Sequence, residues 1–218
     1  MKVLIAGAGR LGTQIAQVLA AGGDYVSLID LDDDRRNELR GRVAARLVAG
    51  DACEPTVLED AGARTTDLLV AATDGDEDNL VISLLATRQF AVPRVAARVN
   101  DTDNTWLFDE HWGVDVAVPA ATPLISLIEE ATGAADTVAL LRLSKAGVNI
   151  IETAITPHSR AVGHPLADIP LPAGTVVAAV IRNGEPTVPD PRFRLAPGDE
   201  LIFVSEAATR QDIDAAFQ

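Results

Sequence analysis

The sequence predicts an α/β protein in which a Rossmann-like, doubly wound parallel sheet is followed by a small α+β domain. Three observations carry this prediction. Strand-like and helix-like segments alternate in the first half, a glycine motif follows the first strand, and β-branched segments broken by Pro and Gly dominate after Gly133. The 218 residues suit one domain or two small ones, and the 48% apolar content is typical of a globular chain.

The first half consists of short apolar runs separated by segments with helical periodicity. The expected strands are residues 2–6, 25–30, 46–49, 68–72, 94–98 and 114–118. The expected helices are residues 11–22, 33–42, 54–61, 76–90 and 102–111. Strands and helices that alternate at this spacing form βαβ units, and these units build a parallel sheet.

A further helix, from Thr122 to Gly133, is expected to join the two halves, with Thr122 as its N-cap and Pro123 at its first position. Strand-like segments then cover residues 137–143, 149–155, 175–182 and 200–204, and a last helix covers 207–217. We therefore expect a nucleotide-binding domain at 1–120, a crossover or dimerisation helix at 121–135, and a small α+β domain at 136–218.

The charge of the chain excludes some classes of partner. Its formal net charge is −14, and residues 1–133 hold 11 Lys and Arg against 22 Asp and Glu. Nucleic acids and anionic membrane surfaces attract basic proteins, so neither is expected as a partner. No apolar stretch is long enough to span a membrane and no signal peptide is recognisable, which predicts a cytoplasmic protein. A single cysteine excludes an internal disulfide.

The motif that carries chemistry is G-x-G-x-x-G, formed by Gly7, Ala8, Gly9, Arg10, Leu11 and Gly12 directly after the first expected strand. In this motif the first glycine permits the tight turn, the second lets a phosphate approach, and the third lets the helix pack on the strand. The helix amino terminus then binds the phosphate. We favour a phosphate contact for Arg10 over a solvated surface charge.

Asp30 ends the second expected strand, 23 residues after Gly7, where a carboxylate accepts hydrogen bonds from ribose hydroxyls. The same carboxylate repels a 2′-phosphate, so NAD or an adenosine nucleotide fits better than NADP. Leu31, the next residue, is included in the predicted site.

The ends of the later strands should line the same crevice. The candidate residues there are Asp51, Ala52, Cys53, Thr73, Asp74, Asn79 and Arg98. Helix capping is an equally good explanation for Asp51 and Asp74, and a surface ion pair is the alternative for Arg98. Asp74, Asp76 and Asp78 start like a calcium loop, but Asn79 and Leu85 break the pattern, so no metal ligand is predicted and a loosely held divalent cation remains open.

A dehydrogenase would need an acid–base group beside the nicotinamide. The only tyrosine, Tyr25, begins the second strand, far from the ligand edge, and Lys145 lies in the second domain. We therefore expect a nucleotide that is sensed and not turned over, so that the protein is not an enzyme. A small NAD-dependent oxidoreductase is the alternative, whereas a redox-sensing transcription regulator is disfavoured by the acidic charge.

Several motifs together resemble the regulatory nucleotide-binding subunits of Trk/Ktr-type potassium uptake systems, the TrkA family, which is built from RCK domains. In the first half the matching segments are GAGRLG at 7–12, LID ending at Asp30, GDA at 50–52, AATDGDEDN at 71–79 and ARVND at 97–101. In the second half they are GHPL at 163–166, IRNG at 181–184, Pro189 and PGDEL at 197–201. The resemblance covers essentially the whole chain.

The resemblance implies a cytoplasmic protein that binds NAD(H) or ATP/ADP and gates a separate potassium-translocating membrane subunit. It also implies a homodimer that assembles into a ring. In such proteins the glycine motif with Arg10 would hold phosphates and Asp30 the ribose. Asp51 and Ala52 would hold the adenosine end, and Thr73, Asp74 and Arg98 the rest of the pocket. Cys53 stands where many relatives have a small hydroxyl residue.

Overall fold

The computed structural model describes residues 1–143 and 147–218, which form two compact units, Met1–Ala121 and Thr122–Gln218. Each unit contains one sheet. Lys145, which the sequence places in the second domain, lies outside the described residues. Within the described ranges, no helix is long and apolar enough to cross a membrane.

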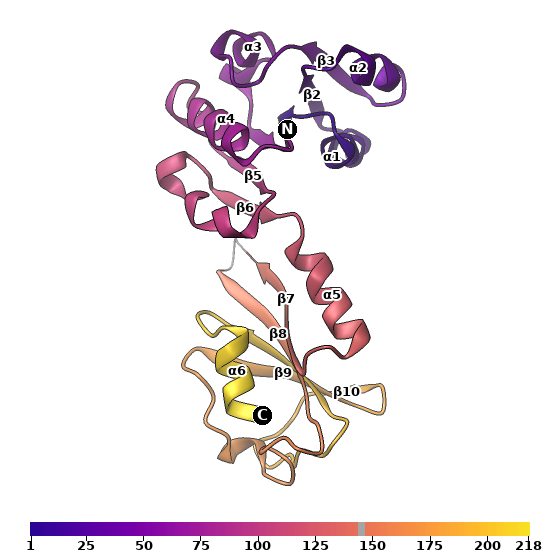
Figure 1. The fold of residues 1–218 in the computed structure, drawn as a ribbon, viewed down its shortest axis with the longest axis vertical. Helices are drawn as coiled ribbons and strands as arrows, with labels where there is room; N and C mark the ends of the chain where they lie inside the picture. The colour runs from indigo at the N-terminus through magenta and orange to yellow at the C-terminus, as the bar shows by residue number, and fades with distance from the viewer. Residues whose placement is uncertain (144–146) are drawn as a thin grey trace. The chain divides into compact units, whose positions relative to one another are not determined.

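The first unit is built on a parallel sheet with strand order β3-β2-β1-β4-β5-β6, the order of the Rossmann fold (Figure 1). Its strands are β1 (Lys2–Ala6), β2 (Tyr25–Asp30), β3 (Ala45–Ala49), β4 (Leu68–Ala71), β5 (Val95–Val99) and β6 (Val116–Pro119). All six expected strands are present with their ends shifted by two residues at most, and the predicted fold class is confirmed.

Helices cover both faces of this sheet. They are α1 (Arg10–Ala21), α2 (Asp33–Leu39), α3 (Pro55–Asp60) and α4 (Asp76–Arg88), with a short 3-10 turn η1 (Ala63–Thr65) after α3. Ala16 of α1 and Leu39 of α2 pack with Val3 and Ile5 on one face. Leu58 of α3 and residues of α4 pack on the other, so the core lies in two layers on either side of the strands. Figure 1 shows the helices on both sides of the sheet.

The helix expected over residues 102–111 is replaced by two 3-10 helices, η2 (Thr102–Leu107) and η3 (Glu110–Trp112). Each begins after an aspartate, and the carboxylates of Asp101 and Asp109 accept hydrogen bonds from the backbone N–H groups of Asp103 and His111. These local side-chain bonds compete with regular helix formation and divide the segment.

The second unit contains an antiparallel sheet with strand order β10-β9-β11-β8-β7. Its elements are α5 (Thr122–Thr132), β7 (Thr137–Leu143), β8 (Val148–Ala154), a 3-10 turn η4 (Leu166–Asp168), β9 (Thr175–Arg182), β10 (Glu185–Thr187), β11 (Glu200–Ser205) and α6 (Arg210–Phe217). The sequence predicts four of these strands but not β10, whose Glu-Pro-Thr composition lacks a strand pattern.

Two residues of the second-half motifs meet in this unit. The fully buried Asp199 accepts two bonds from Arg182, at 2.6 Å from Nε and 2.7 Å from Nη2, and a third from the Ala196 backbone N–H. Burial favours the neutral carboxyl, but the bonds from Arg182 and Ala196 outweigh it and lower the pKa of Asp199. This contact ties the β9 end to the turn before β11.

Candidate functional site

A cleft of about 330 Å³ opens at the carboxyl ends of β1, β2, β3 and β4. Strand order reverses between β1 and β4, because β2 and β3 lie on one side of β1 and β5 and β6 lie beyond β4. Ligands of open α/β sheets bind at such a point. The cleft therefore lies where the sequence predicts a nucleotide.

The three motif glycines have different surroundings. Gly7 has φ +99°, and a Cβ there would lie 2.8 Å from the Ala72 carbonyl oxygen. A Cβ on Gly12 would lie 1.9 Å from the Gly7 carbonyl oxygen, so α1 packs on the turn only without a side chain. A Cβ on Gly9 would meet no protein atom within 4 Å, although Gly9 lines the cleft. Close packing requires Gly7 and Gly12, whereas Gly9 faces open space.

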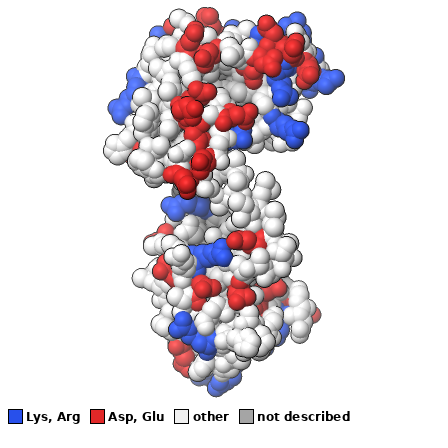
Figure 2. All heavy atoms as spheres, viewed as in Figure 1, with Lys and Arg blue, Asp and Glu red and all other residues white. Residues whose placement is uncertain are grey.

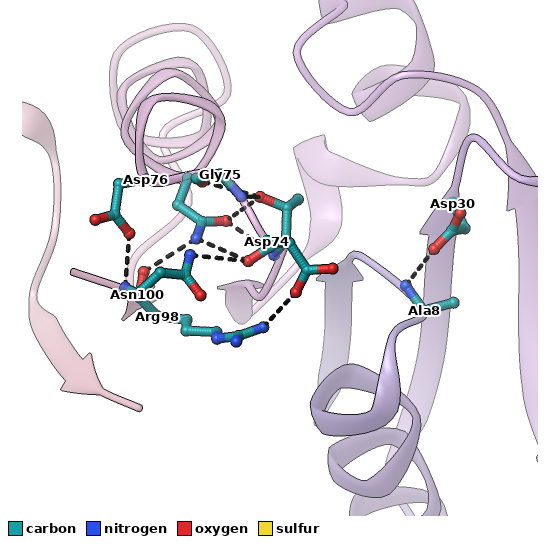
Figure 3. A network of polar contacts seen from close by, with 9 residues as sticks. Ala8, Asp30, Asp74, Gly75, Asp76, Arg98 and Asn100 are labelled. Carbon is teal, nitrogen blue, oxygen red and sulfur yellow. Dashed lines mark hydrogen bonds and ion pairs between the residues drawn. The ribbon is translucent and has the colours of Figure 1, made fainter. Parts of the chain in front are cut away.

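Asp30 joins β2 to the glycine turn. Its carboxylate accepts the Ala8 backbone N–H at 2.6 Å and the Asp32 backbone N–H at 2.8 Å, and Figure 3 shows the first contact. A carboxylate has about four acceptor positions, so Asp30 keeps acceptor capacity toward the cleft, which it also lines.

The turn between β4 and α4 is held by one buried side chain, Asn79. Its Oδ1 accepts the Thr73 backbone N–H at 2.9 Å and the Thr73 hydroxyl at 2.8 Å. Its Nδ2 donates to the Arg98 carbonyl oxygen at 3.0 Å. Asn79 is fully buried, so it positions the turn and the end of β5 and does not itself face the cleft.

Arg98 and Asp74 pair across the ends of β5 and β4. Nη1 of Arg98 lies 2.8 Å from Oδ1 of Asp74, whose side chain is 92% exposed and lines the cleft. Nε of Arg98 is buried, and no acceptor for it exists among the residues that the structure describes. The guanidinium thus retains donor capacity next to the cleft.

Asp76, at the start of α4, has a structural role. Its carboxylate accepts the backbone N–H groups of Asn100 at 2.7 Å and Asp101 at 3.0 Å, and Nδ2 of Asn104 at 2.9 Å. Figure 3 shows the contact with Asn100. Burial favours the neutral carboxyl, but these hydrogen bonds outweigh it and lower the pKa of Asp76. Asp76 is therefore an ionised anchor that holds the segment after β5 against α4.

Cys53 lies in the wall of the cleft as a protonated thiol. Burial and the nearby charges of Asp78 and Asp51 raise its pKa to about 12. Its Sγ lies 3.7 Å from Oδ1 of Asp78, consistent with a thiol that donates to a carboxylate. A thiol with such a pKa is a poor nucleophile at neutral pH.

The structure brings most of the predicted site residues to the cleft. Those that line it are Gly7, Gly9, Asp30, Leu31, Asp51, Ala52, Cys53, Thr73 and Asp74. The predicted residues outside its lining are Ala8, Arg10, Leu11, Gly12, Asn79 and Arg98. Ala8 and Asn79 are fully buried, and Arg10 is exposed on the first turn of α1.

Three charged residues of the lining lie outside the set of predicted site residues: Asp32, Arg35 and Asp78. Asp32 caps α2 by accepting the Asp34 and Arg35 N–H groups. Its position two residues after Asp30 is a sequence signal that places it at the same end of the sheet.

Among the residues that the structure describes, no group of three or more His, Cys, Asp or Glu side chains is arranged to hold a metal. Figure 2 shows the acidic side chains in clusters on the 1–121 unit.

Each of the two units matches a known protein-domain family. The TrkA-N domain family matches residues 3–120, and the TrkA-C domain family matches residues 141–218. The chain belongs to the TrkA family. A Trk system potassium uptake protein TrkA from Mycobacterium tuberculosis H37Rv is 38% identical over 213 residues, covering 98% of this chain and 96% of that protein. TrkA proteins are regulatory in potassium transport and are not enzymes.

Solved structures share the fold of this chain. A GsuK channel bound to NAD superimposes with a TM-score of 0.58 at 16% identity, over 94% of this chain. The TrkA chain spans 37% of that channel chain, and the likeness shows the fold. The AMP-bound Kef C-terminal domain of Shewanella denitrificans is 26% identical with a TM-score of 0.51, over 62% of this chain and 81% of that one.

Proposed function

We propose that this TrkA protein is a cytoplasmic, nucleotide-sensing subunit that binds NAD(H) or ATP/ADP in the β1–β4 cleft and gates a separate membrane potassium transporter of the Trk/Ktr type. The observation that carries the proposal is the contrast among the glycines: Gly7 and Gly12 are packed tightly, whereas Gly9 faces free space inside the cleft. Such an arrangement leaves room for a phosphate against the backbone at the amino end of α1.

The residues present fit a nucleotide. The α1 amino terminus offers free N–H groups, and Arg10 on its first turn adds a positive charge toward a phosphate. Asp30 would accept ribose hydroxyls, and Asp51 with Ala52 and Cys53 would border the adenosine end. Thr73 and Asp74, backed by Asn79 and Arg98, would close the far wall.

Two named neighbours support this ligand class, because one is described as bound to NAD and the other as AMP-bound. NADP should be disfavoured, since its 2′-phosphate would meet Asp30 and Asp32. Arg36 cannot compensate, because its guanidinium is engaged by the Asp30 carbonyl oxygen and the Asp33 carboxylate. Arg35 lines the cleft and would moderate the repulsion.

A domain without a pore acts on ion flux by moving a protein to which it is attached. The four exposed apolar side chains of α5 (Leu124, Ile125, Leu127 and Ile128) support a homodimer, which would assemble into a ring against the transporter. A nucleotide bound at the strand ends would then change the geometry that the transporter senses. We accordingly assign residues 1–120 to nucleotide binding, 121–135 to coupling and 136–218 to the small domain.

Potassium flux through the cognate transporter in liposomes tests the proposal. Flux should depend on added TrkA protein, and NADH, ATP or ADP should change it. With Gly9→Ala the nucleotide response should shift to at least about tenfold higher concentration while the protein still folds. Asp60→Ala, an exposed aspartate outside the cleft, is the control. If the TrkA protein is bound to the transporter and none of the nucleotides changes the potassium flux, nucleotide-controlled gating is refuted.

A further inference from the structure

A second groove, of about 440 Å³, lies at the opposite end of the parallel sheet from the nucleotide cleft. It is formed where β1, β2 and β3 begin and is bordered by Gly62, Thr65 and Thr66. None of its lining residues is shared with the cleft. We propose that this groove binds a small organic anion, one that carries a phosphate or carboxylate beside a flat ring.

The groove exists because α3 is too short to cover its sheet face. Six helical residues span about 9 Å, whereas the six residues of β2 span about 20 Å. Along β2, Tyr25, Ser27 and Ile29 point to the same face, because strand side chains alternate. Ile29 packs with Leu58 of α3, whereas Tyr25 and Ser27 extend beyond the helix and line the groove.

The neighbouring strands bring two cations to that uncovered face. The register pairs Lys2 with Tyr25 and Ser27 with Arg46, so both basic residues lie beside the β2 residues that line the groove. The Arg46 side chain is exposed and has no hydrogen-bond or ion-pair partner in the ranges 1–143 and 147–218. Nζ of Lys2 has only a neutral partner, the Thr65 hydroxyl at 3.3 Å.

The acidic residue of the groove is already neutralised. Oδ1 of Asp24 lies 2.9 Å from the amino-terminal ammonium of Met1. The free charges of the lining are therefore both positive, within a half of the chain that holds twice as many acids as bases. A guanidinium and an ammonium on one open face favour a phosphate or carboxylate.

The exposed ring of Tyr25 is the reason to expect a flat ring in the ligand. The Tyr25 side chain is 78% exposed although it lines a concave surface, and the lining also includes Ala61 and the hydroxyl-bearing Thr65 and Thr66. A flat ring stacked on Tyr25 would bury this aromatic surface while its anionic group reaches Arg46. An anion without a ring would satisfy only part of the groove.

Tyr25 is the only tyrosine of the chain, so fluorotyrosine labelling gives one ¹⁹F signal that reports on the groove. Titration with phenyl phosphate should shift this signal and reach saturation. Benzylamine, with the same ring and the opposite charge, should give no saturable shift. Inorganic phosphate, without the ring, should bind about tenfold more weakly or worse. Saturating NADH should leave the phenyl phosphate affinity unchanged.

Arg46→Gln should weaken phenyl phosphate binding about tenfold or more. Arg42→Gln removes an exposed arginine outside the groove and should leave it unchanged. Equal shifts with phenyl phosphate and benzylamine, a linear response, or competition by NADH would overturn the proposal. The ligand comparison in the unmodified chain decides this even if Arg46→Gln does not fold.

Discussion

The Asp30 carboxylate accepts the Ala8 backbone N–H at 2.6 Å and so joins the carboxyl end of β2 to the glycine turn after β1. The residue that the sequence assigns to ribose binding therefore also fixes the turn that would hold the phosphates. Binding and positioning reside in one side chain. Removing this side chain should weaken nucleotide binding in two ways, because the ribose contact is lost and the glycine turn is held less firmly.

Two glycine substitutions separate ligand binding from folding. Gly9→Ala adds a methyl group that meets no protein atom within 4 Å, and its φ of −60° suits alanine, so unfolding free energy should change by about 0.5 kcal/mol or less. Nucleotide affinity should nevertheless fall at least about tenfold. Gly12→Ala places a Cβ 1.9 Å from a backbone oxygen and should cost about 3 kcal/mol or more. Urea unfolding and ligand titration of both variants check this, and equal stabilities would contradict it.

The Cys53 thiol should react slowly. With its pKa raised to about 12 by burial, Asp78 and Asp51, its thiolate fraction at pH 8 is about 10⁻⁴, and iodoacetamide should label it far more slowly than free cysteine. Asp78→Asn removes one of the charges and should speed the labelling. Mass spectrometry of the intact chain follows the reaction. Labelling at the rate of free cysteine would refute this protonated state.

Asp76 should make the first unit sensitive to acid. Its folded pKa lies below the ordinary value of about 3.8, so its contribution to stability is complete above that value and is lost as pH falls through the folded pKa. Asp76→Ala leaves two backbone N–H groups without their acceptor and should cost about 2–4 kcal/mol at pH 7.

Both tryptophans, Trp106 and Trp112, belong to the first unit, so their fluorescence reports its unfolding alone. Urea unfolding at pH 7 and pH 3 should show a smaller loss of stability between these pH values for Asp76→Asn than for the unmodified chain. Asp60→Asn, at an exposed position, serves as the control. An unchanged pH dependence in Asp76→Asn would show that Asp76 is not the titrating group.

The apolar face of α5 should control assembly. Leu127 and Ile128 are 57% and 62% exposed in the single chain, and burying them against a second copy would stabilise a dimer. Leu127→Asp should therefore shift the chain toward monomers in light scattering. Thr122→Asp, on the same helix but at its exposed amino end, should leave the dimer intact. If the unmodified chain is monomeric, the apolar face of α5 does not form a dimer interface.

Local patterns predict the first unit well because its strands are short apolar runs and its helices are periodic. The exception, residues 102–111, lost its helix to the side-chain bonds of Asp101 and Asp109, which periodicity does not register. β10 was missed because pairing with β9, and not strand propensity, holds Glu185–Thr187 in the sheet.

The candidate site was predictable where a residue ends a strand, as Asp30 does, or follows one, as Asp51 and Thr73 do. The role of Asp76 was not, because its partners Asn100 and Asn104 come from a segment 24 to 28 residues away. Spacing alone suggested an incomplete calcium loop there. Only the packing of the segment after β5 against α4 shows that the Asp76 carboxylate accepts hydrogen bonds from the protein itself.

Calorimetric titration of the unmodified chain with NADH and with ADP tests the central claim most directly. Both should bind at one site per chain, and Asp30→Ala should weaken each about ten- to hundredfold, because charge-assisted hydrogen bonds are worth about 1.5–3 kcal/mol. Asp60→Ala should bind like the unmodified chain. Absence of binding by both nucleotides, or equal affinities in Asp30→Ala and the unmodified chain, would contradict a nucleotide site at the β1–β4 cleft.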